Sequence, residues 1–201
     1  MDITAMFKIG YGLYVLTAKE GERHNGCIIN TTVQVTDNPN RISICVSKSN
    51  FTHGMIWHTG EFNISVLTTS APYQLFKDFG FRSGKDEDKF AGRTDTAYSQ
   101  NGLIYLTEHT NAYLSCKVVS ALDLGTHTLF IADVTDGKNL SGEESVTYSY
   151  YHSNIKPKPD KTQAKKGWRC KVCGYIYEGE ELPPDYICPI CKHGADAFEK
   201  L

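Results

Sequence analysis

Residues 168–191, WRCKVCGYIYEGEELPPDYICPIC, decide how the chain is divided and what its last part does. Two CxxC pairs, Cys170/Cys173 and Cys188/Cys191, stand there with fourteen residues between them. Thiolates at this spacing predict a tetrahedral metal site in which all four cysteines are ligands. Spacing alone favours zinc, which would make the segment a structural tail, over iron, which would make it an electron carrier.

The segment 168–201 is too short to fold on an apolar core alone. It falls below the limit of about 40 residues at which such a core suffices, so metal ligation must supply stability. The aromatic residues near the cysteines in the sequence are Trp168, Tyr175, Tyr177, Tyr186 and Phe198. An apolar shell tunes a redox metal, but a small zinc ribbon would use one as well.

A lysine-rich stretch separates this segment from the rest of the chain. Residues 152–167 hold five lysines and two prolines. Such a composition cannot bury enough apolar surface to repay ordering. The sequence therefore predicts one domain over 1–151, a flexible linker over 152–167 and a metal-binding domain over 168–201.

The long N-terminal part is mainly β. Runs rich in β-branched and aromatic residues predict strands at 11–18, 27–36, 41–48, 62–68, 103–108, 113–124 and 127–138. Two stretches predict helices, 50–60 with Asn50 as its cap and 71–80 with Pro72 near its start. Many strands at short spacing with few helices predict a closed or nearly closed barrel.

Composition excludes several classes of function. The formal net charge is −2, which favours neither nucleic acid nor an anionic membrane as a partner. No run approaches 18 consecutive apolar residues, and the N-terminus lacks the pattern of a signal peptide. The seven cysteines are odd in number and four of them are clustered, which predicts a reducing, cytoplasmic location and no disulfide framework.

Two polar clusters in the N-terminal part are candidates for binding a phosphorylated ligand. The first lies on or beside the strand 27–36 and comprises Asn30, Thr31, Thr32 and Gln34. The second lies where a strand gives way to a helix and includes Ser47, Lys48, Asn50, Thr52 and His53. Hydroxyls, a lysine and a helix N-terminus together suit a phosphate, although a capped helix and a solvated turn would give the same pattern. Two further candidates are Lys89, in the charged loop 81–90, and His127, which opens the last strand.

The C-terminal segment resembles rubredoxin. The resemblance rests on CxxCGYIYEG, LPPDYICPIC and the final DAFEKL, and it covers residues 168–201. The spacer between the two cysteine pairs is shorter than is usual in that family, as in the rubredoxin-like modules of rubrerythrin-type proteins. The resemblance implies one iron held by the four cysteines.

The N-terminal part resembles the FMN-binding split-barrel flavin reductases. Four motifs carry the resemblance in the family's order: NGCxxNTxxQVT, VSKxNxTHxxI with GEFNISVL, SGKDxDKF and GTHTLFIADV. It implies FMN at a homodimer interface, held by the strand 27–34 and the turn 46–53. It also implies that Lys89 lies near the flavin and that His127, as the catalytic candidate, lies near the flavin or the nicotinamide. Lys85 stands where the SGxD motif often carries arginine, which keeps the charge but loses bidentate geometry.

The whole chain resembles the high-molecular-weight rubredoxins. The resemblance implies an oxidoreductase that passes electrons from NADH or NADPH through FMN to the iron, and on to a flavodiiron protein that reduces O2 or NO. Two alternatives remain open. The chain could be a flavin reductase with a zinc-ribbon tail that supplies free reduced FMN, or a non-enzymatic FMN-binding protein with a docking tail.

Overall fold

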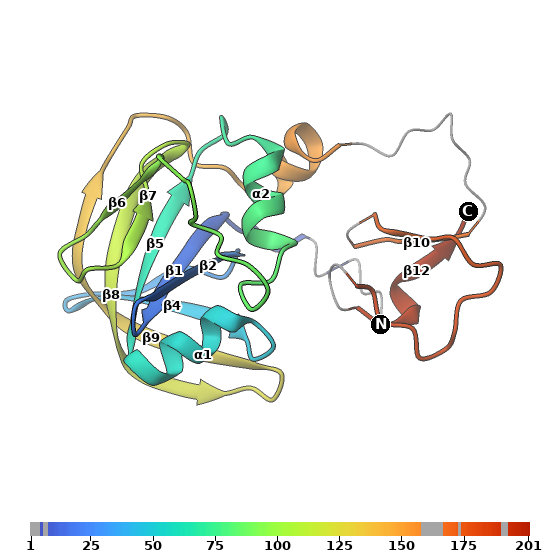
Figure 1. Cartoon of the computed structure of the whole chain (residues 1–201), viewed down its shortest axis with the longest axis horizontal. Coiled ribbons are helices and arrows are strands. Elements are labelled where there is room, and N and C mark those ends of the chain that lie inside the picture. The colour runs from blue at the N-terminus through green and yellow to red at the C-terminus, as the bar shows by residue number, and fades with distance from the viewer. Residues whose placement is uncertain (1–4, 6–7, 158–166, 173, 190–192) are drawn as a thin grey trace. The chain divides into compact units, whose positions relative to one another are not determined.

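The computed structural model describes residues 5, 8–157, 167–172, 174–189 and 193–201, and divides the chain into two compact units, Met1–Lys156 and Pro157–Leu201 (Figure 1). The strands of the N-terminal unit are β1 (Tyr14–Glu20), β2 (Arg23–Ile29), β3 (Val33–Asp37), β4 (Asn40–Ser47), β5 (Glu61–Leu67), β6 (Thr96–Tyr98), β7 (Ile104–Leu106), β8 (Thr110–Asp123) and β9 (His127–Asn139). The predicted mainly β fold is confirmed.

A seven-stranded antiparallel sheet in the order β2-β1-β5-β8-β9-β4-β3 is the main sheet of the N-terminal unit, and β6 and β7 pair in a separate two-stranded sheet. The predicted strand 27–36 is instead two strands, because the chain leaves β2 after Ile29 and begins β3 at Val33. Register shifts interrupt β5 near Val66 and β8 near Ser115 and Val118. Such bulges bend and twist a strand, which helps a wide sheet to curl.

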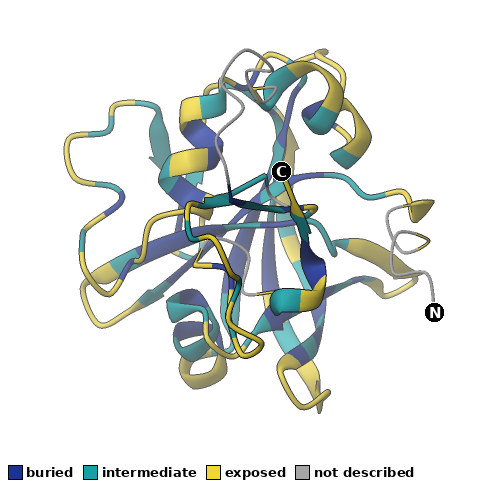
Figure 2. Cartoon of the chain, turned by 90° about the vertical axis from the view of Figure 1, so that its right-hand side faces the viewer, coloured by how far each residue is buried: buried dark blue, intermediate teal, exposed yellow. Residues whose placement is uncertain are grey.

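The sheet curls around a buried cluster, because residues from strands far apart in its order pack together. Cys27 of β2 and Ile44 of β4 belong to the same buried cluster as Leu16, Phe62 and Phe130. Figure 2 shows the buried residues concentrated along the central strands and the exposed ones along loops and hairpin ends. This barrel-like core also encloses Cys116, whose thiol pKa burial raises to about 12.

Helix α1 (Phe51–Thr59) begins and ends as the sequence predicts. The Asn50 side chain accepts from the backbone N–H of Thr52 at 3.0 Å. Gly60 ends the helix in the left-handed conformation at φ 71°, where glycine has no steric penalty. Met55 and Ile56 on the inner face are each 1% exposed and pack into the barrel core.

A second core lies under α2 (Tyr73–Gly80), where Leu75, Phe76 and Phe79 are buried. The helical segment α3 (Tyr148–Tyr150) and η2 (Tyr151–Ile155) joins this core through Tyr151, whose ring centroid is 4.6 Å from that of Phe76. The linker boundary predicted at residue 152 therefore falls inside a helical segment. Of the predicted linker, residues 158–166 lie outside the described residues. No helix in the described part of the chain is long and apolar enough to cross a membrane.

The C-terminal unit has a small sheet of β11 (Ile176–Tyr177), β10 (Trp168–Cys170) and β12 (Phe198–Lys200), in that order, and a turn of 3-10 helix, η3 (Ala195–Ala197). Its core consists of Cys170, Cys188, Ala197 and Phe198, against which the partly buried residues Trp168, Val172, Tyr175, Tyr177, Leu182 and Tyr186 pack. All five aromatic residues of the predicted shell thus belong to or pack against the core that holds the two described cysteines.

Candidate functional site

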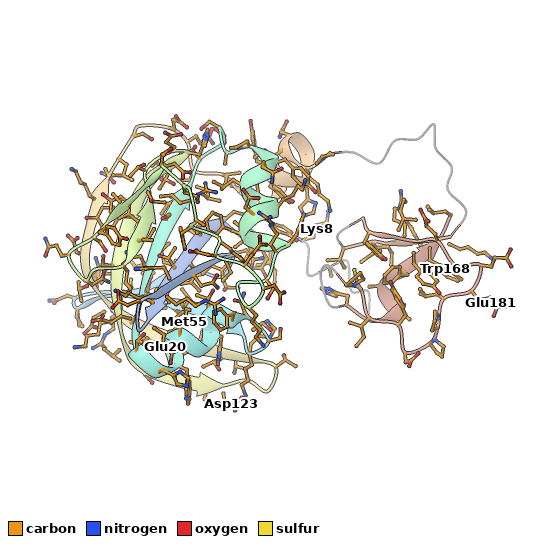
Figure 3. The ribbon with its side chains drawn as sticks, in the orientation of Figure 1. Lys8, Glu20, Met55, Asp123, Trp168 and Glu181 are labelled. Carbon is orange, nitrogen blue, oxygen red and sulfur yellow. The ribbon has the colours of Figure 1, made fainter. Side chains whose placement is uncertain are left out.

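The end of β4 and the turn after it bring the predicted residues Ser47 and Lys48 beside His127, which begins β9. Ser47 pairs directly with His127, and the Lys48 backbone N–H donates to the Thr126 carbonyl at 3.0 Å. The Lys48 ammonium forms an ion pair with Asp123 at 2.6 Å. Asp123 is the last residue of β8 and lies at the end of the β8–β9 hairpin (Figure 3). The side chains of Ser47 and Ser49 share a hydrogen bond of 2.9 Å, so hydroxyls line the same turn.

His53 sits on the first turn of α1 and faces β9. Its Nε2 lies 2.8 Å from the hydroxyl of Thr128, and its ring stacks on Trp57 at 6.2 Å between centroids. Burial lowers the pKa of His53, and the positive charges of Lys48 and His127 lower it further. The neutral imidazole is therefore favoured at this position, where it can accept or donate one hydrogen bond.

The first turn of α1 is also fixed from its other side. Asn25 of β2 is 2% exposed and donates from Nδ2 to the Thr52 hydroxyl at 2.8 Å. The predicted residues Asn50 and Thr52 are thus occupied in holding the turn in place. Their side chains shape the site rather than point freely from it.

Lys89 is a buried residue that ties the loop 81–95 to the unit. Its ammonium donates to the carbonyls of Gly26 at 2.9 Å and Phe79 at 3.2 Å. Burial lowers the pKa of Lys89, while the nearby Cys27 thiol opposes this effect. In these described contacts, Lys89 holds the loop against the backbone at Gly26 and Phe79.

The segment between β2 and β3 carries the other predicted residues. The Thr31 hydroxyl donates to the Cys45 carbonyl at 2.9 Å and accepts from the Cys45 N–H at 3.1 Å, so it lies beside β4. Asn30 and Thr32 are half-buried next to it, and the buried Thr32 hydroxyl has no hydrogen-bond partner within the described part of the chain. A buried hydroxyl left unpaired costs free energy, and a bound ligand or water would remove that cost.

Gln34 is not part of this group. It pairs with Ile42, and its amide donates to Asn40 at 3.3 Å. Ile42 and Ser47 are five residues apart on one strand, which corresponds to roughly 17 Å. The remaining predicted residues lie around the start of α1, the end of β4, the start of β9 and the 30–32 segment. Lys89 is connected to this region indirectly, through the hydrogen bond from its ammonium to the Gly26 carbonyl of β2.

The donor set at the turn 47–53 fits a phosphorylated flavin. A lysine, two serine hydroxyls and the N-terminus of α1 suit a phosphate, and the unpaired Thr32 hydroxyl is available to a polar ring edge. The Asp123 carboxylate, which pairs with Lys48, is the charge that a phosphate would compete with at this turn.

The two described cysteines of the C-terminal unit fit a shared metal. Cys170 and Cys188 are both 0% exposed and lie in the same small core. Gly174 adopts φ 78° and its N–H donates to the Cys170 carbonyl, which is the tight turn expected of a metal knuckle. Cys173 and Cys191, the other two predicted ligands, lie outside the described residues. Sulfur donors in an aromatic core suit iron or zinc.

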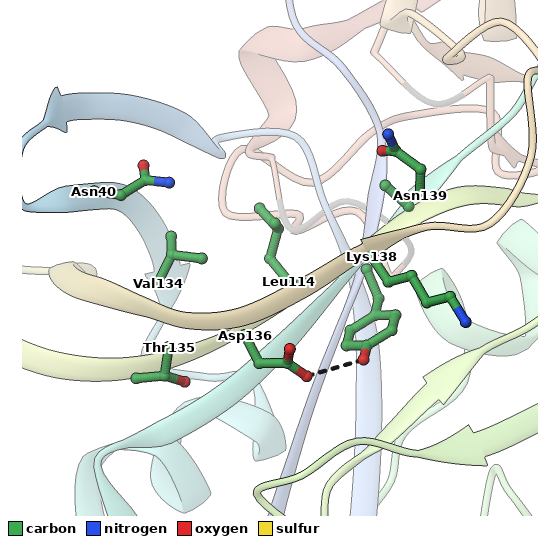
Figure 4. Close-up of a pocket in the computed structure, with 10 residues that line it drawn as sticks. Asn40, Leu114, Val134, Thr135, Asp136, Lys138 and Asn139 are labelled. Carbon is green, nitrogen blue, oxygen red and sulfur yellow. Dashed lines mark hydrogen bonds between the residues drawn. The ribbon is translucent and has the colours of Figure 1, made fainter.

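A separate cleft of about 420 Å³ opens at the other end of the sheet (Figure 4). Leu114 and Val134 line it together with Asp136, which accepts from the Tyr113 hydroxyl at 2.9 Å. Asn40, at the opposite end of β4 from Ser47, also lines it. None of the predicted binding residues does, so this cleft is not the site that the sequence points to.

The residues that hold the site together carry no signal of that role in the sequence. These are Arg23, Asn25, Gly84, Asp123 and Thr128. Asp123 and Thr128 are each 75 residues from their partners Lys48 and His53. No local pattern signals such contacts. Asn25 and Gly84 stand inside the NGCxxNTxxQVT and SGKDxDKF motifs, so the motifs mark their positions without revealing their contacts.

Two family models match the chain. The flavin reductase like domain matches residues 6–158, and the rubredoxin-like domain of rubrerythrin matches residues 168–199. The order of the two domains agrees with the two compact units of the structure.

Relatives match the whole chain or a large part of it. The chain is 39% identical over 230 residues to the high molecular weight rubredoxin of Moorella thermoacetica, covering all of both chains. It is 38% identical over 162 residues to the ferric-chelate reductase (NAD(P)H) of Archaeoglobus fulgidus, covering 81% of this chain and 95% of that one. Diflavin flavoprotein A 1 of Synechocystis sp. is 30% identical over 140 residues, which are 69% of this chain and 24% of that one.

The fold is similar to that of the FMN-binding protein from Thermus thermophilus, with a TM-score of 0.61 and 21% identity, covering 67% of this chain and 74% of that one. The chain belongs to the flavin reductase-like family and, with its rubredoxin-like C-terminal domain, to the high molecular weight rubredoxins.

Proposed function

We propose that this chain oxidises NADH or NADPH and passes the electrons through FMN and a four-cysteine iron to a protein acceptor. It is an oxidoreductase of the flavin reductase-like family. The observation that carries the proposal is the presence of two sites in one chain. The N-terminal unit has a turn whose hydrogen-bond donors and lysine suit a phosphate, and the C-terminal unit has two fully buried cysteines in its core.

FMN accepts a hydride and releases single electrons, and a thiolate-bound iron carries one electron at a time. The protein's own residues bind and orient these groups. Lys48, Ser47 and the N-terminus of α1 hold the phosphate, and Thr31 and Thr32 border the ring system. Cys170, Cys173, Cys188 and Cys191 hold the iron.

His127 is the residue we assign to contact with the flavin or the nicotinamide. It is exposed, it pairs with Ser47 at the phosphate turn, and its Nδ1 lies 2.9 Å from the Thr126 hydroxyl. This hydrogen bond leaves Nε2 as the atom that can reach a ligand. Its role is to bind and orient the ligand at the mouth of the site.

A homodimer would complete the site. Three large apolar residues beside the turn are strongly exposed: Trp57 at 58%, Leu122 at 59% and Leu124 at 51%. Trp57 lies on α1 next to His53, and the two leucines flank Asp123 in the hairpin that pairs with Lys48. A second copy that covers these side chains would also exclude water from the flavin.

The acceptor we propose is a flavodiiron-type protein. A segment similar to the N-terminal unit forms about a quarter of diflavin flavoprotein A 1. Fusion of such a segment to a larger flavoprotein supports electron transfer between the two kinds of domain. In the chain described here, the rubredoxin-like unit would carry out that transfer to a separate partner.

A visible absorption spectrum before and after anaerobic addition of NADH tests the proposal. We expect flavin bands overlaid with red ferric-thiolate absorption, both bleached by NADH. A yellow protein with zinc in native material would reject electron transfer by the C-terminal unit and leave the zinc-ribbon flavin reductase. Bound FMN with no NADH or NADPH oxidation would instead leave the non-enzymatic FMN-binding protein.

A further inference from the structure

The loop that contains the SGK motif rests on β2 through a glycine with no room for a side chain. Gly84 is buried, although Ser83 and Lys85 on either side are exposed. A Cβ at Gly84 would lie 2.0 Å from Oδ1, 2.4 Å from Cγ and 2.7 Å from Nδ2 of Asn25. The backbone at Gly84 does not adopt the left-handed conformation, so the need for glycine here is one of space.

Asn25 connects this glycine to the first turn of α1. Its amide group lies against Gly84 on one side, and its Nδ2 donates to the Thr52 hydroxyl on the other. Thr52 in turn donates its backbone N–H to the capping side chain of Asn50. Gly84, Asn25, Thr52 and Asn50 therefore form a continuous line of contacts from the loop to the phosphate turn.

Two cations hold the loop against β2 around this contact. Arg23 donates to the carbonyls of Gly84 and Lys85, and its guanidinium lies 4.7 Å from the ring centroid of Phe51, the first residue of α1. Lys89 anchors the other end of the loop to the Gly26 carbonyl. The loop cannot lift from β2 without breaking these charge-assisted hydrogen bonds, so a clash at Gly84 must be relieved by moving Asn25.

We propose that Asn25 is a positioning residue for the flavin phosphate, and that Gly84 is required because it lets the SGK loop close over the Asn25 amide. This inference rests on the proposed binding of FMN at the turn 47–53. Asn25 acts through Thr52: it fixes the first turn of α1, and with it the backbone N–H groups that face the phosphate. A side chain at Gly84 turns the Asn25 amide away from Thr52 and loosens that turn.

The test is a double-mutant cycle in the full-length protein with Gly84→Ala, Asn25→Ala and the double variant. Gly142→Ala is the control, because a Cβ at Gly142 meets nothing within 4 Å. The readouts are the Kd for FMN, the Tm of the flavin-free protein, and KM and kcat for NADH at saturating FMN. Each single variant removes one buried hydrogen bond and should weaken FMN binding about tenfold.

The double variant distinguishes positioning from general damage. With alanine at position 25 the added methyl at position 84 meets no amide, so the double variant should bind FMN no worse than Asn25→Ala alone. At saturating FMN, kcat should recover in each variant. Losses that multiply to about a hundredfold would overturn the inference, since independent sites add in free energy.

Two other results would separate a failure of this inference from a failure of the proposed function. If Asn25→Ala or Gly84→Ala binds FMN like the wild type when both are measured well below their Tm, the inference is wrong, because the first result removes the positioning role of Asn25 and the second removes the need for glycine at position 84. If the wild-type protein binds no FMN, the proposed function fails first, and the two failures are not confused.

Discussion

The Nε2 atom of His53 lies 2.8 Å from Oγ1 of Thr128, and this contact joins the first turn of α1 to β9. Thr128 is 1% exposed, so the hydroxyl that bonds to His53 is shielded from water. The pair brings helix and sheet together beside Lys48 and His127, which also surround the proposed phosphate.

His53 should make the protein less stable in mild acid. Its pKa in the folded protein lies below the usual 6.5, so the unfolded chain binds the proton at higher pH. The free energy of unfolding should therefore fall as the pH drops below about 6.5 towards the folded-state pKa. The slope should stay well under about 1.4 kcal/mol per pH unit, because the ring is partly solvated.

Urea denaturation between mildly acidic and neutral pH checks this for the wild type and His53→Gln. The variant should have the shallower pH dependence. A residual slope is expected in both proteins, because burial also lowers the pKa values of His24 and His152. Equal slopes in the two proteins would show that His53 is protonated alike in folded and unfolded chains.

Replacing Lys89 by methionine should destabilise the N-terminal unit. Methionine keeps most of the apolar stem but leaves the Gly26 and Phe79 carbonyls without their ammonium donor. Loss of buried hydrogen bonds to a charged group should lower the free energy of unfolding by about 2 to 4 kcal/mol. Lys85→Met in the same loop is the matched control, because Lys85 is exposed, and it should change the unfolding midpoint little.

Removing the Asp123 carboxylate should strengthen anion binding at the turn. The Lys48 ammonium is paired with Asp123 at 2.6 Å, and Asp123→Asn would leave that charge for a phosphate. We expect a several-fold lower Kd for FMN at low salt, and a smaller difference at high salt because ions screen exposed charges. Asp133→Asn, which removes the partner of Arg41, is the control. An unchanged Kd at low salt would place the phosphate away from Lys48.

Serine at Cys170 or Cys188 should abolish iron binding and unfold the C-terminal unit alone. Both sulfurs are buried in a core of few residues, and such a unit depends on its metal for stability. Iron analysis and the red absorption measure the loss, while flavin content should be retained. Cys45→Ser in the N-terminal unit should keep its iron. Full iron content in Cys170→Ser would remove Cys170 from the ligand set.

Local signals in the sequence predicted much of the fold. Asn50 and Gly60 mark the ends of α1 because capping depends on neighbouring backbone groups. The β2–β3 break was missed, because Asn30, Thr31 and Thr32 continue the alternation of a strand while Thr31 bonds to β4 instead. The helical segment at 151–155 was missed because it depends on burial of Tyr151 against Phe76, a contact between distant residues.

The sequence predicted which residues form the candidate site better than it predicted the contacts that those residues make. Motifs placed Lys48, Asn50 and His53 at one turn, and the structure keeps them there. The sequence could not reveal that Asp123 pairs with Lys48, or that Asn25 donates to Thr52, since both contacts join residues that lie far apart in the sequence.

The burial of Cys27 and Cys116 has a practical consequence for chemistry at the metal. Both thiols lie in the barrel core and burial raises their pKa values, so neither offers a thiolate to an alkylating or oxidising reagent while the N-terminal unit is folded. The pKa of the half-buried Cys45 is raised as well. Thiol reagents applied to the native protein should therefore count mainly the cysteines of the C-terminal unit, which makes thiol titration a direct measure of how much of the protein holds its metal.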